Sequence, residues 1–261
     1  MLRDLKALVG AREILYMLSW RDIKIRYKQS LMGLMWAILM PSLIVGAGIL
    51  VRLAAAKYTA TSVSDHDLAS VIFRATFWSL FVSSIRFGTN SLVANNNLIS
   101  KLAFPKEVFP LASVASCLFD FLIAFTAALI ILLVTGWRPS LDALWAAPIL
   151  LTFVMLSAGL AMLLSAMNLF YRDVKYVVEV FLTYAIFFTP VLYEVSIAGK
   201  WRNLLLVNPV APLLEALADT LVWRRPPNAL WTAYGFIASV LIAAFGYWTF
   251  KRLEADFAER I

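Results

Sequence analysis

The sequence predicts an all-α integral membrane protein with six transmembrane helices, and three observations support this fold class. Of its 261 residues, 62% are hydrophobic and 15% are charged, and the mean hydropathy is +0.81. Soluble domains carry about 25% charged residues. Several apolar runs reach the roughly 20 residues that a helix needs to cross a bilayer. Lys and Arg gather in alternate connections between these runs. No repeat or linker divides residues 1–261, so we expect a single membrane domain.

Residues 1–30 are expected to form an amphipathic helix on the cytoplasmic membrane surface. Its aromatic and apolar stripe, at helical spacing, consists of Tyr16, Trp20, Ile23 and Tyr27. The neighbouring basic stripe consists of Arg21, Lys24 and Lys28. Two interpretations of the basic stripe stay open: simple anchoring to anionic lipids, or contact with the phosphates of a bound lipid-linked substrate. No cleavable signal peptide is expected, because seven Lys and Arg residues precede the first long apolar run.

Six apolar segments are expected to form the bundle at 31–250, with a cytoplasmic tail at 251–261. The segments are 31–51, 69–94, 108–135, 143–171, 176–193 and 227–250. With the amino terminus inside, the cytoplasmic pieces carry 14 Lys and Arg residues and the outer loops carry 7. The positive-inside rule therefore places both termini in the cytoplasm.

A seventh apolar stretch, 203–214, lies between the fifth and sixth spans. It is too short to cross a bilayer and is broken by Pro209 and Pro212. Stretches of this kind are typical of re-entrant or interfacial segments. We therefore expect a re-entrant segment on the outer side.

Four charged residues fall within the predicted spans, where an unpaired charge is costly. They are Arg74, Arg86, Asp120 and Glu179. Comparison of their depths predicts that Arg86 forms a buried ion pair with Asp120 first and with Glu179 second. A proton relay is the alternative interpretation. No role is predicted for Arg74.

Residues 95–107 separate the second and third spans on the cytoplasmic side. Three consecutive Asn residues at 95–97 oppose helix formation, and Pro105 ends any turn that follows them. Between them, Leu98 and Phe104 belong to a short apolar face. The segment is either a short helix that docks on a partner or a solvated loop with one helical turn.

Several kinds of active site are not supported by the sequence. There is no GxxxxGK[ST] phosphate loop and no credible Ser/His/Asp set. The one histidine, His66, lies between Asp65 and Asp67, where a solvated loop is a simpler interpretation than a metal site. The one cysteine, Cys117, excludes an intrachain disulfide. No catalytic residue and no metal site are therefore expected, and any ATPase would be another chain.

Five blocks of sequence together resemble a known family. They are WRDIKIRY at 20–27 with Trp36 and Pro41 downstream, TNSLV at 89–93, FPKE at 104–107, NLFYRDV at 168–174, and TPVLY at 189–193 with Asn208-Pro209 following. Their order and spacing over residues 20–214 resemble the permease subunits of ABC transporters that export bacterial polysaccharides, namely O-antigen, capsule or teichoic acid.

The resemblance implies a homodimer in the bacterial inner membrane, joined by two copies of a cytoplasmic ATP-binding subunit. ATP and Mg would be bound by that subunit, so this chain would hold no cofactor and would not itself be an enzyme. Its substrate would be a lipid-linked polysaccharide, and nucleic acid is not expected as a partner. The coupling and gate residues would be Asn97, Leu98, Lys101, Phe104, Pro105, Lys106, Arg172 and Asp173. The pyrophosphate contacts would be Arg21, Lys24 and Lys28.

Two aromatic stripes could line a path for a glycan, because aromatic faces stack on sugar rings without fixing a hydrogen-bond pattern. The first stripe is Phe73, Phe77 and Phe81, and the second is Phe181, Tyr184 and Phe188. Trp36 or Tyr193 would continue the path. Ordinary packing or lipid contact is the alternative for both stripes.

Two other functions remain open at this stage. One is a small-lipid or drug permease of the same architecture. The other is a membrane-bound glycosyl or lipid transferase, which would need acid and base residues at one membrane face. The acids that could serve are Asp65, Asp67, Glu215 and Asp219, and their spacing forms no convincing set.

Overall fold

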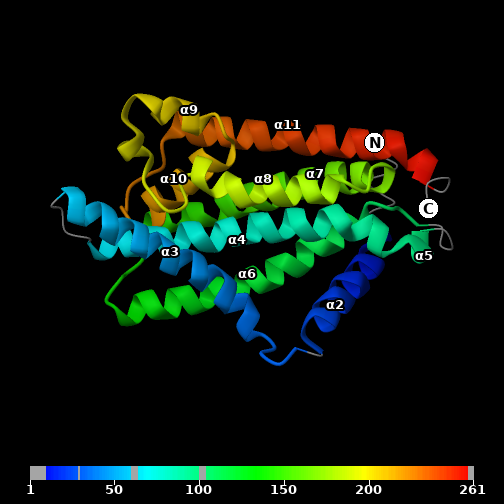
Figure 1. Cartoon of the computed structure of the whole chain (residues 1–261), viewed down its shortest axis with the longest axis horizontal. Helices are drawn as coiled ribbons and strands as arrows, with labels where there is room; N and C mark the ends of the chain where they lie inside the picture. The colour runs from blue at the N-terminus through cyan, green and yellow to red at the C-terminus, as the bar shows by residue number, and fades with distance from the viewer. Residues whose placement is uncertain (1–9, 29, 60–63, 100–103, 258–261) are drawn as a thin grey trace.

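The computed structural model describes residues 10–28, 30–59, 64–99 and 104–257, and every regular element among them is a helix. Figure 1 shows long helices lying side by side, with α5 and the end of α11 at one end of the molecule and the α9–α10 region at the other. The α-helices are α2 (Arg12–Lys28), α3 (Met35–Thr59), α4 (Asp65–Ala94), α5 (Asn96–Ile99), α6 (Val108–Val134), α7 (Ala146–Phe170), α8 (Val174–Phe188), α9 (Arg202–Leu206), α10 (Val210–Leu221) and α11 (Ala229–Leu253). The 3-10 turns are η1 (Leu141–Trp145), η2 (Val195–Trp201) and η3 (Glu254–Asp256).

Helix α4 is the centre of the bundle. It packs against α3, α6, α7, α8 and α10, and most of its side chains are buried. Its start is set by a capping box, in which the Ser64 hydroxyl accepts from the Asp67 amide and the Asp67 carboxylate accepts from the Ser64 amide. Such a box satisfies two backbone donors that the first turn of a helix leaves unpaired. The central position of α4 lets its charged side chains pair with α3, α8 and α10.

Five of the described helices are long and apolar enough to cross a membrane, by length and composition. They cover 35–54, 65–94, 108–134, 141–170 and 229–256. These correspond to five of the six segments expected from the sequence. The remaining segment, 176–193, forms α8, which has 15 residues and ends at Phe188. A helix of that length spans only about 22 Å.

The apolar stretch 203–214 forms two helices around a break at Pro209. Helix α9 ends at Leu206, and α10 begins at Val210. All of α10 is buried except Glu215, because it packs among α4, α7 and α11. Pro209 therefore interrupts the apolar stretch and allows it to turn back into the bundle end, as seen beside the start of α11 (Figure 1). Pro212, in contrast, lies in the first turn of α10, where proline is tolerated.

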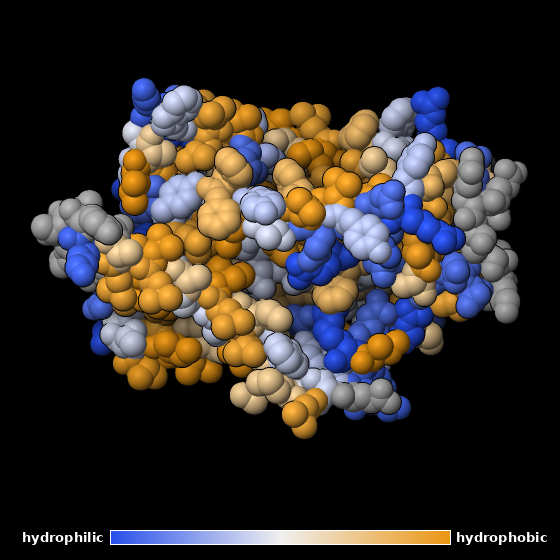
Figure 2. All heavy atoms as spheres, viewed as in Figure 1, coloured by the Kyte–Doolittle hydropathy of each residue, from blue (hydrophilic) through white to orange (hydrophobic). Residues whose placement is uncertain are grey.

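Helix α2 lies across α6, at an angle to the long helices (Figure 1). Tyr16 and Trp20 of its aromatic stripe are exposed, whereas Leu18 is buried. Figure 2 shows hydrophilic side chains gathered toward this end of the molecule and apolar ones over much of the rest.

The contact between α7 and α11 depends on two glycines. A Cβ atom at Gly246 would lie 2.1 Å from the Gly159 carbonyl oxygen, and one at Gly159 would lie 2.4 Å from the Ala243 Cα. Both distances are far below van der Waals contact. Small residues of this kind let membrane helices approach closely enough for backbone contact.

We predict that Gly246→Ala lowers the melting temperature of the purified protein. The added methyl would push α11 away from α7, and overpacking of this kind costs about 1–3 kcal/mol. The matched control is Gly46→Ala on α3, where a Cβ would meet nothing within 4 Å. Both changes raise helix propensity equally. Equal melting temperatures for the two variants would contradict the proposed close contact.

Candidate functional site

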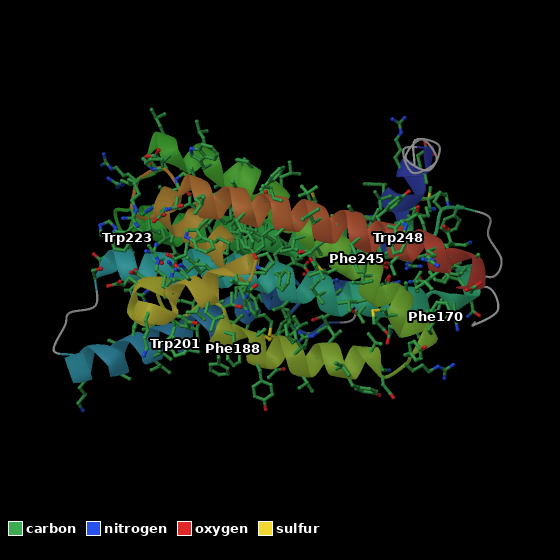
Figure 3. The ribbon with its side chains drawn as sticks, turned by 90° about the horizontal axis from the view of Figure 1, so that it is seen from above. Phe170, Phe188, Trp201, Trp223, Phe245 and Trp248 are labelled. Carbon is green, nitrogen blue, oxygen red and sulfur yellow. The ribbon has the colours of Figure 1, made fainter. Side chains whose placement is uncertain are left out.

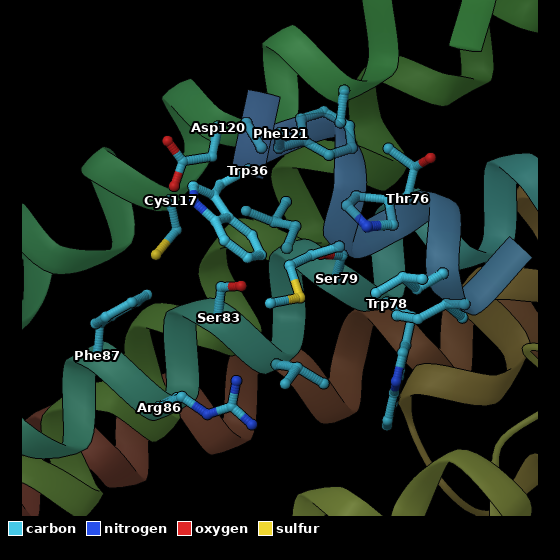
Figure 4. A pocket seen from close by; sticks show the side chains of 18 of the residues that line it. Trp36, Thr76, Trp78, Ser79, Ser83, Arg86, Phe87, Cys117, Asp120 and Phe121 are labelled. Atoms are coloured by element: carbon cyan, nitrogen blue, oxygen red, sulfur yellow. The ribbon is translucent and has the colours of Figure 1, made fainter. Parts of the chain in front are cut away.

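A cavity of about 480 Å³ opens between α3, α4, α6 and α8, with the end of α2 at one side. Its wall combines polar groups with aromatic rings. The polar side chains include Arg26, Thr76, Ser79, Ser83, Arg86 and Asp120. The aromatic side chains include Tyr27, Trp36, Trp78, Phe87 and Phe121. Figure 4 shows Trp36 lying between Asp120 of α6 and Ser83 of α4. A volume of this size and a mixed lining are typical of small-molecule sites.

The turn between α2 and α3 brings Trp36 to the cavity. Gly33 adopts φ +52, a left-handed conformation that side chains rarely allow. Its amide lies close to both the carbonyl and the hydroxyl oxygens of Ser30, to which it donates. The chain thereby reverses direction, and α3 begins at Met35 beside the cavity.

Asp120 is held by α2. The Arg26 guanidinium donates to one Asp120 oxygen and the Tyr27 hydroxyl donates to the other. The Arg26 group also donates to the Ser116 hydroxyl and lies 4.2 Å from the centre of the Phe87 ring. Burial raises the pKa of the Tyr27 phenol, and the nearby Arg26 charge partly opposes this. The acid therefore joins α2 to α6 and is already neutralised.

The prediction that Arg86 pairs first with Asp120 is wrong. Both guanidinium arms of Arg86 donate to Glu179 of α8, at 2.9 and 2.6 Å, which was the second choice. The pair is also not buried within this chain, since the two side chains are 47% and 48% exposed. The depth comparison measured position along the helices and ignored the direction in which each side chain points. Arg26 was not considered as a partner of Asp120, because it lies in α2, outside the predicted spans and outside both of the stripes assigned to that helix.

The aromatic stripe of α4 packs inside the bundle and does not line a path within this chain. Phe73, Phe77 and Phe81 are 0%, 1% and 7% exposed. The Phe77 ring makes edge-to-face contacts with Phe121 and Phe153, with ring centres 4.8 and 5.3 Å apart. Edge-to-face contacts of this kind stabilise a core. The prediction that this stripe lines a channel is therefore wrong, and its packing alternative is correct.

The stripe of α8 has the opposite environment. Phe181, Tyr184 and Phe188 are between 60% and 69% exposed, on the outside of the bundle, where Figure 3 labels Phe188. Tyr193 lies beyond the end of α8, and its hydroxyl donates to the Phe187 carbonyl at 3.0 Å. The face of α8 that carries these three rings lies on the other side of the helix from Glu179, and it is aromatic and uncovered in the single chain.

The three predicted phosphate contacts have different surroundings. Arg21 donates to Asp22 and, at 2.8 Å, to the Asn95 side chain at the end of α4. Lys24 is exposed and lies over the Trp20 ring at 5.5 Å, and Lys28 is also exposed. A second cavity of about 410 Å³ lies beside Arg21, Arg26 and Asn95.

Segment 95–107 is anchored to the end of α11. Glu107 is buried and forms an ion pair with Lys251. The Lys106 amide donates to Glu254, and the Lys106 ammonium donates to the Ile99 carbonyl at 3.0 Å. Burial lowers the pKa of Lys106, and the Glu254 charge opposes this. Leu98 and Phe104 pack partly against the core, so the segment is more than a solvated loop.

Three of the other predicted coupling residues lie on the surface. Asn97 is exposed, and so are Arg172 and Asp173 in the turn between α7 and α8. Figure 1 places α5 and the C-terminal end of α11 at the same end of the molecule. Pro105 is half-buried, and Lys101 lies outside the described residues.

The one histidine, His66, has an aromatic neighbour. The His66 ring stacks on Trp223, with their centres 5.6 Å apart. Among the described residues, no group of three His, Cys, Asp or Glu side chains could hold a metal ion.

Comparison with known proteins identifies relatives over nearly the whole chain. A family model described as ABC-2 type transporter matches residues 13–222. Two O-antigen export system permease proteins RfbA of Klebsiella pneumoniae are 26% and 28% identical over 95% of this chain and 94% of theirs. The O-antigen export system permease protein RfbA of Myxococcus xanthus is 25% identical over all of both chains. These matches confirm the resemblance drawn from the motifs.

We predict that a double-mutant cycle detects coupling between Arg26 and Asp120 and none between Arg86 and Asp120. Breaking a buried pair by removing one partner costs about 3–5 kcal/mol, and removing both recovers part of the loss. Contacting residues couple by about 0.5–3 kcal/mol, whereas separated ones add. Thermal unfolding of Arg26→Gln, Arg86→Gln and Asp120→Asn, singly and combined, measures both cycles. Coupling in the Arg86 cycle alone would contradict the observed pairing.

Proposed function

The chain belongs to the ABC-2 type transporter membrane family, and from this we propose that it is the permease subunit of an ATP-driven polysaccharide exporter. The observation that carries the proposal is the end-to-end match with O-antigen export permeases, which leaves no large part of the chain unexplained. The substrate would be a lipid-linked polysaccharide, moved from the cytoplasmic side across a bacterial inner membrane.

The cavity chemistry supports a neutral, hydroxyl-rich substrate. Its two guanidinium groups, Arg26 and Arg86, already pair with Asp120 and Glu179. The rest of the wall offers hydroxyl groups, such as those of Ser79 and Ser83, beside aromatic faces. A pyranose ring presents hydroxyls at its edge and C–H groups on its faces, so it matches both kinds of surface.

We further propose that the exposed face of α8 meets a second copy of the chain. Exposed aromatic side chains at 181, 184 and 188 form an apolar patch on one face of α8, whereas Leu182, Thr183 and Ile186, on its other face, line the cavity. Contiguous exposed patches of this kind mark interaction surfaces or ligand paths. In a homodimer, the two cavities and the two α8 faces would together line the route of the polymer.

The membrane arrangement follows from the same proposal. Helix α8 with residues 189–193 would complete the sixth span, α2 would lie in the inner headgroup region, and α9 with α10 would form the re-entrant outer segment. Both termini would be cytoplasmic. Two copies of an ATP-binding subunit, which bind ATP and Mg, would dock at the end that holds α5 and the α7–α8 turn. Lys24 and Lys28 would meet the headgroup of the lipid-linked substrate there.

A transferase is disfavoured by how the outer acids are used. Asp67 caps α4 and pairs with Arg52, Glu215 pairs with Arg74, and Asp219 accepts two bonds from Arg225. Acids held in such pairs are poorly placed to exchange protons with a substrate. Three of the four candidate acids thus have structural roles in this chain.

We predict that cells lacking this chain keep their polysaccharide inside and that re-expression of the chain restores it to the surface. The measurement is chemical analysis of intracellular and surface polymer. The control is a variant of the partner ATPase that cannot hydrolyse ATP, which should reproduce the deletion. Normal surface polymer in the deletion strain would overturn the proposal, and retention of a small lipid or drug instead would identify the alternative permease.

We predict that reversing the charges of the α7–α8 turn, with Arg172→Glu and Asp173→Lys together, uncouples the two subunits. Both side chains are exposed, so the fold should persist. Export should fall about tenfold, within the usual 5–150-fold range of coupling between sites, while hydrolysis by the partner continues. Arg138→Glu, an exposed change between α6 and η1, is the matched control. Equal export in both variants would remove this docking assignment.

A further inference from the structure

Arg74 is, with Glu107, one of two ion-paired side chains that are only 1% exposed among the described residues, and the function proposed above does not use it. Its side chain is 1% exposed, in the middle of the bundle. One nitrogen donates to the backbone carbonyl of Tyr193 at 2.7 Å, and another donates to Glu215 of α10 at 2.8 Å. A buried guanidinium is tolerated only when it is paired and hydrogen-bonded in this way. Arg74 therefore joins α4 to α10 and to the chain that follows α8.

The next residue along that chain is held by a second arginine. Arg52 of α3 pairs with Asp67 of α4 and lies 3.8 Å from Glu194. Consecutive residues, Tyr193 and Glu194, are thus tied to α4 and α3 by different guanidinium groups. The residue before them, Leu192, is buried against the same two helices: a Cβ at Gly48 would lie 3.2 Å from Leu192 and 2.6 Å from Val71.

Residues 192–194 lie beyond one end of the cavity. Along α3, residues at intervals of four first line the cavity and then contact this segment. Trp36, Met40 and Ile44 line the cavity, Gly48 meets Leu192, and Arg52 meets Glu194. The segment is therefore wedged between α3 and α4 just beyond the end of the cavity that lies away from α2.

The two arginine contacts differ in tightness. Both Arg74 contacts have hydrogen-bond length. The Nε atoms of both arginines are buried without a hydrogen-bond partner among the described residues. In the Arg52 contact, however, the facing Glu194 oxygen and Arg52 terminal nitrogen also lack a hydrogen bond, because they lie 3.8 Å apart. Unmade bonds of buried polar groups are costly. The Arg52 contact can thus change more easily than the Arg74 contacts.

We propose that Arg74 is a positioning residue for polymer release: it holds residues 192–194 and α10 together as one unit, which moves relative to α3 when the Arg52–Glu194 contact opens. This inference rests on the proposed export function for its transport consequence. Without Arg74, residues 192–194 and α10 lose their common attachment. ATP hydrolysis then continues, but fewer polymer chains leave for each ATP consumed.

The test compares Arg74→Gln, Arg74→Lys, Glu215→Gln and the double change Arg74→Gln with Glu215→Gln, each assembled with its ATPase in membranes. Polymer exported per ATP hydrolysed is measured at equal amounts of folded protein. Arg74→Gln should lower this ratio about tenfold, within the range usual for coupled sites. Arg74→Lys should restore part of it, since an ammonium can reach one partner but lacks the fork that reaches two. The control is Arg225→Gln, which should leave the ratio unchanged. Arg225 also forms an ion pair, with Asp219, but its side chain is 63% exposed.

If Arg74→Gln does not fold, the double variant still tests the proposal, because it removes the charges of both Arg74 and Glu215 and leaves no unpaired charge in the core. A normal ratio in the double variant, or in folded Arg74→Gln, would overturn the proposal.

Hydrogen exchange of the same proteins supplies a readout without transport. Amides of 190–196 and of α10 should lose protection in the Arg74 variants, while those of α11 keep theirs. If the Arg74 variants exchange faster but the unaltered chain exports no polymer, the proposed function alone is refuted. If exchange in the Arg74 variants is unchanged, the role of Arg74 is refuted.

Discussion

The pairing of arginine side chains in an apolar bundle is the constraint on which the arrangement of the helices depends. Arg26 joins α2 to α6, Arg52 joins α3 to α4, Arg74 joins α4 to α10, and Arg86 joins α4 to α8. Apolar side chains in lipid gain little by exchanging one helix neighbour for another. A guanidinium without its acid is costly in the same surroundings. The ion pairs therefore specify which helices meet, and α4 takes part in three of these four junctions.

Glycine sets how closely the helices approach once the pairs are chosen. Besides the contact of α7 with α11, a Cβ at Gly88 of α4 would lie 2.5 Å from the Ala161 side chain of α7. This close approach accompanies the burial of Phe77 and Phe153 in the same interface. The centre of the bundle is thus dense and rigid, whereas α3 and α8, at its edge, retain uncovered faces. Motion during transport is easier to accommodate at that edge than across the α4–α7 interface.

The sequence predicted the elements of the fold better than their contacts. Five of its six apolar segments form long helices, and the family resemblance is confirmed, because length, hydropathy and motif order are properties of the chain alone. The direction of a stripe around the bundle is not such a property. Helical spacing showed that Phe73, Phe77 and Phe81 share a face, but α4 is surrounded on several sides, so that face points into the core. Asp120 was assigned to the wrong arginine because the position of α2 across α6 has no periodic signal. The charge of Arg74 within an apolar segment correctly indicated that it must be paired. Its partner, Glu215, could not be predicted, because α10 reaches Arg74 only by folding back into the bundle.

The distribution of charge suggests how the proposed exporter could handle two unlike parts of one substrate. A lipid-linked polysaccharide combines an anionic headgroup with a long, largely neutral chain. In this protein the exposed cations Lys24 and Lys28 lie on α2, whereas the cations that line the cavity are each neutralised by an acid. A neutralised, hydroxyl-bearing and aromatic wall offers a chain many weak and equivalent contacts, so each sugar can replace the one before it. A free cation in that wall would instead hold an anionic group and oppose sliding. In the proposed exporter, pairing Arg26 and Arg86 with acids would therefore serve packing and passage together, and it would leave recognition of the headgroup to α2.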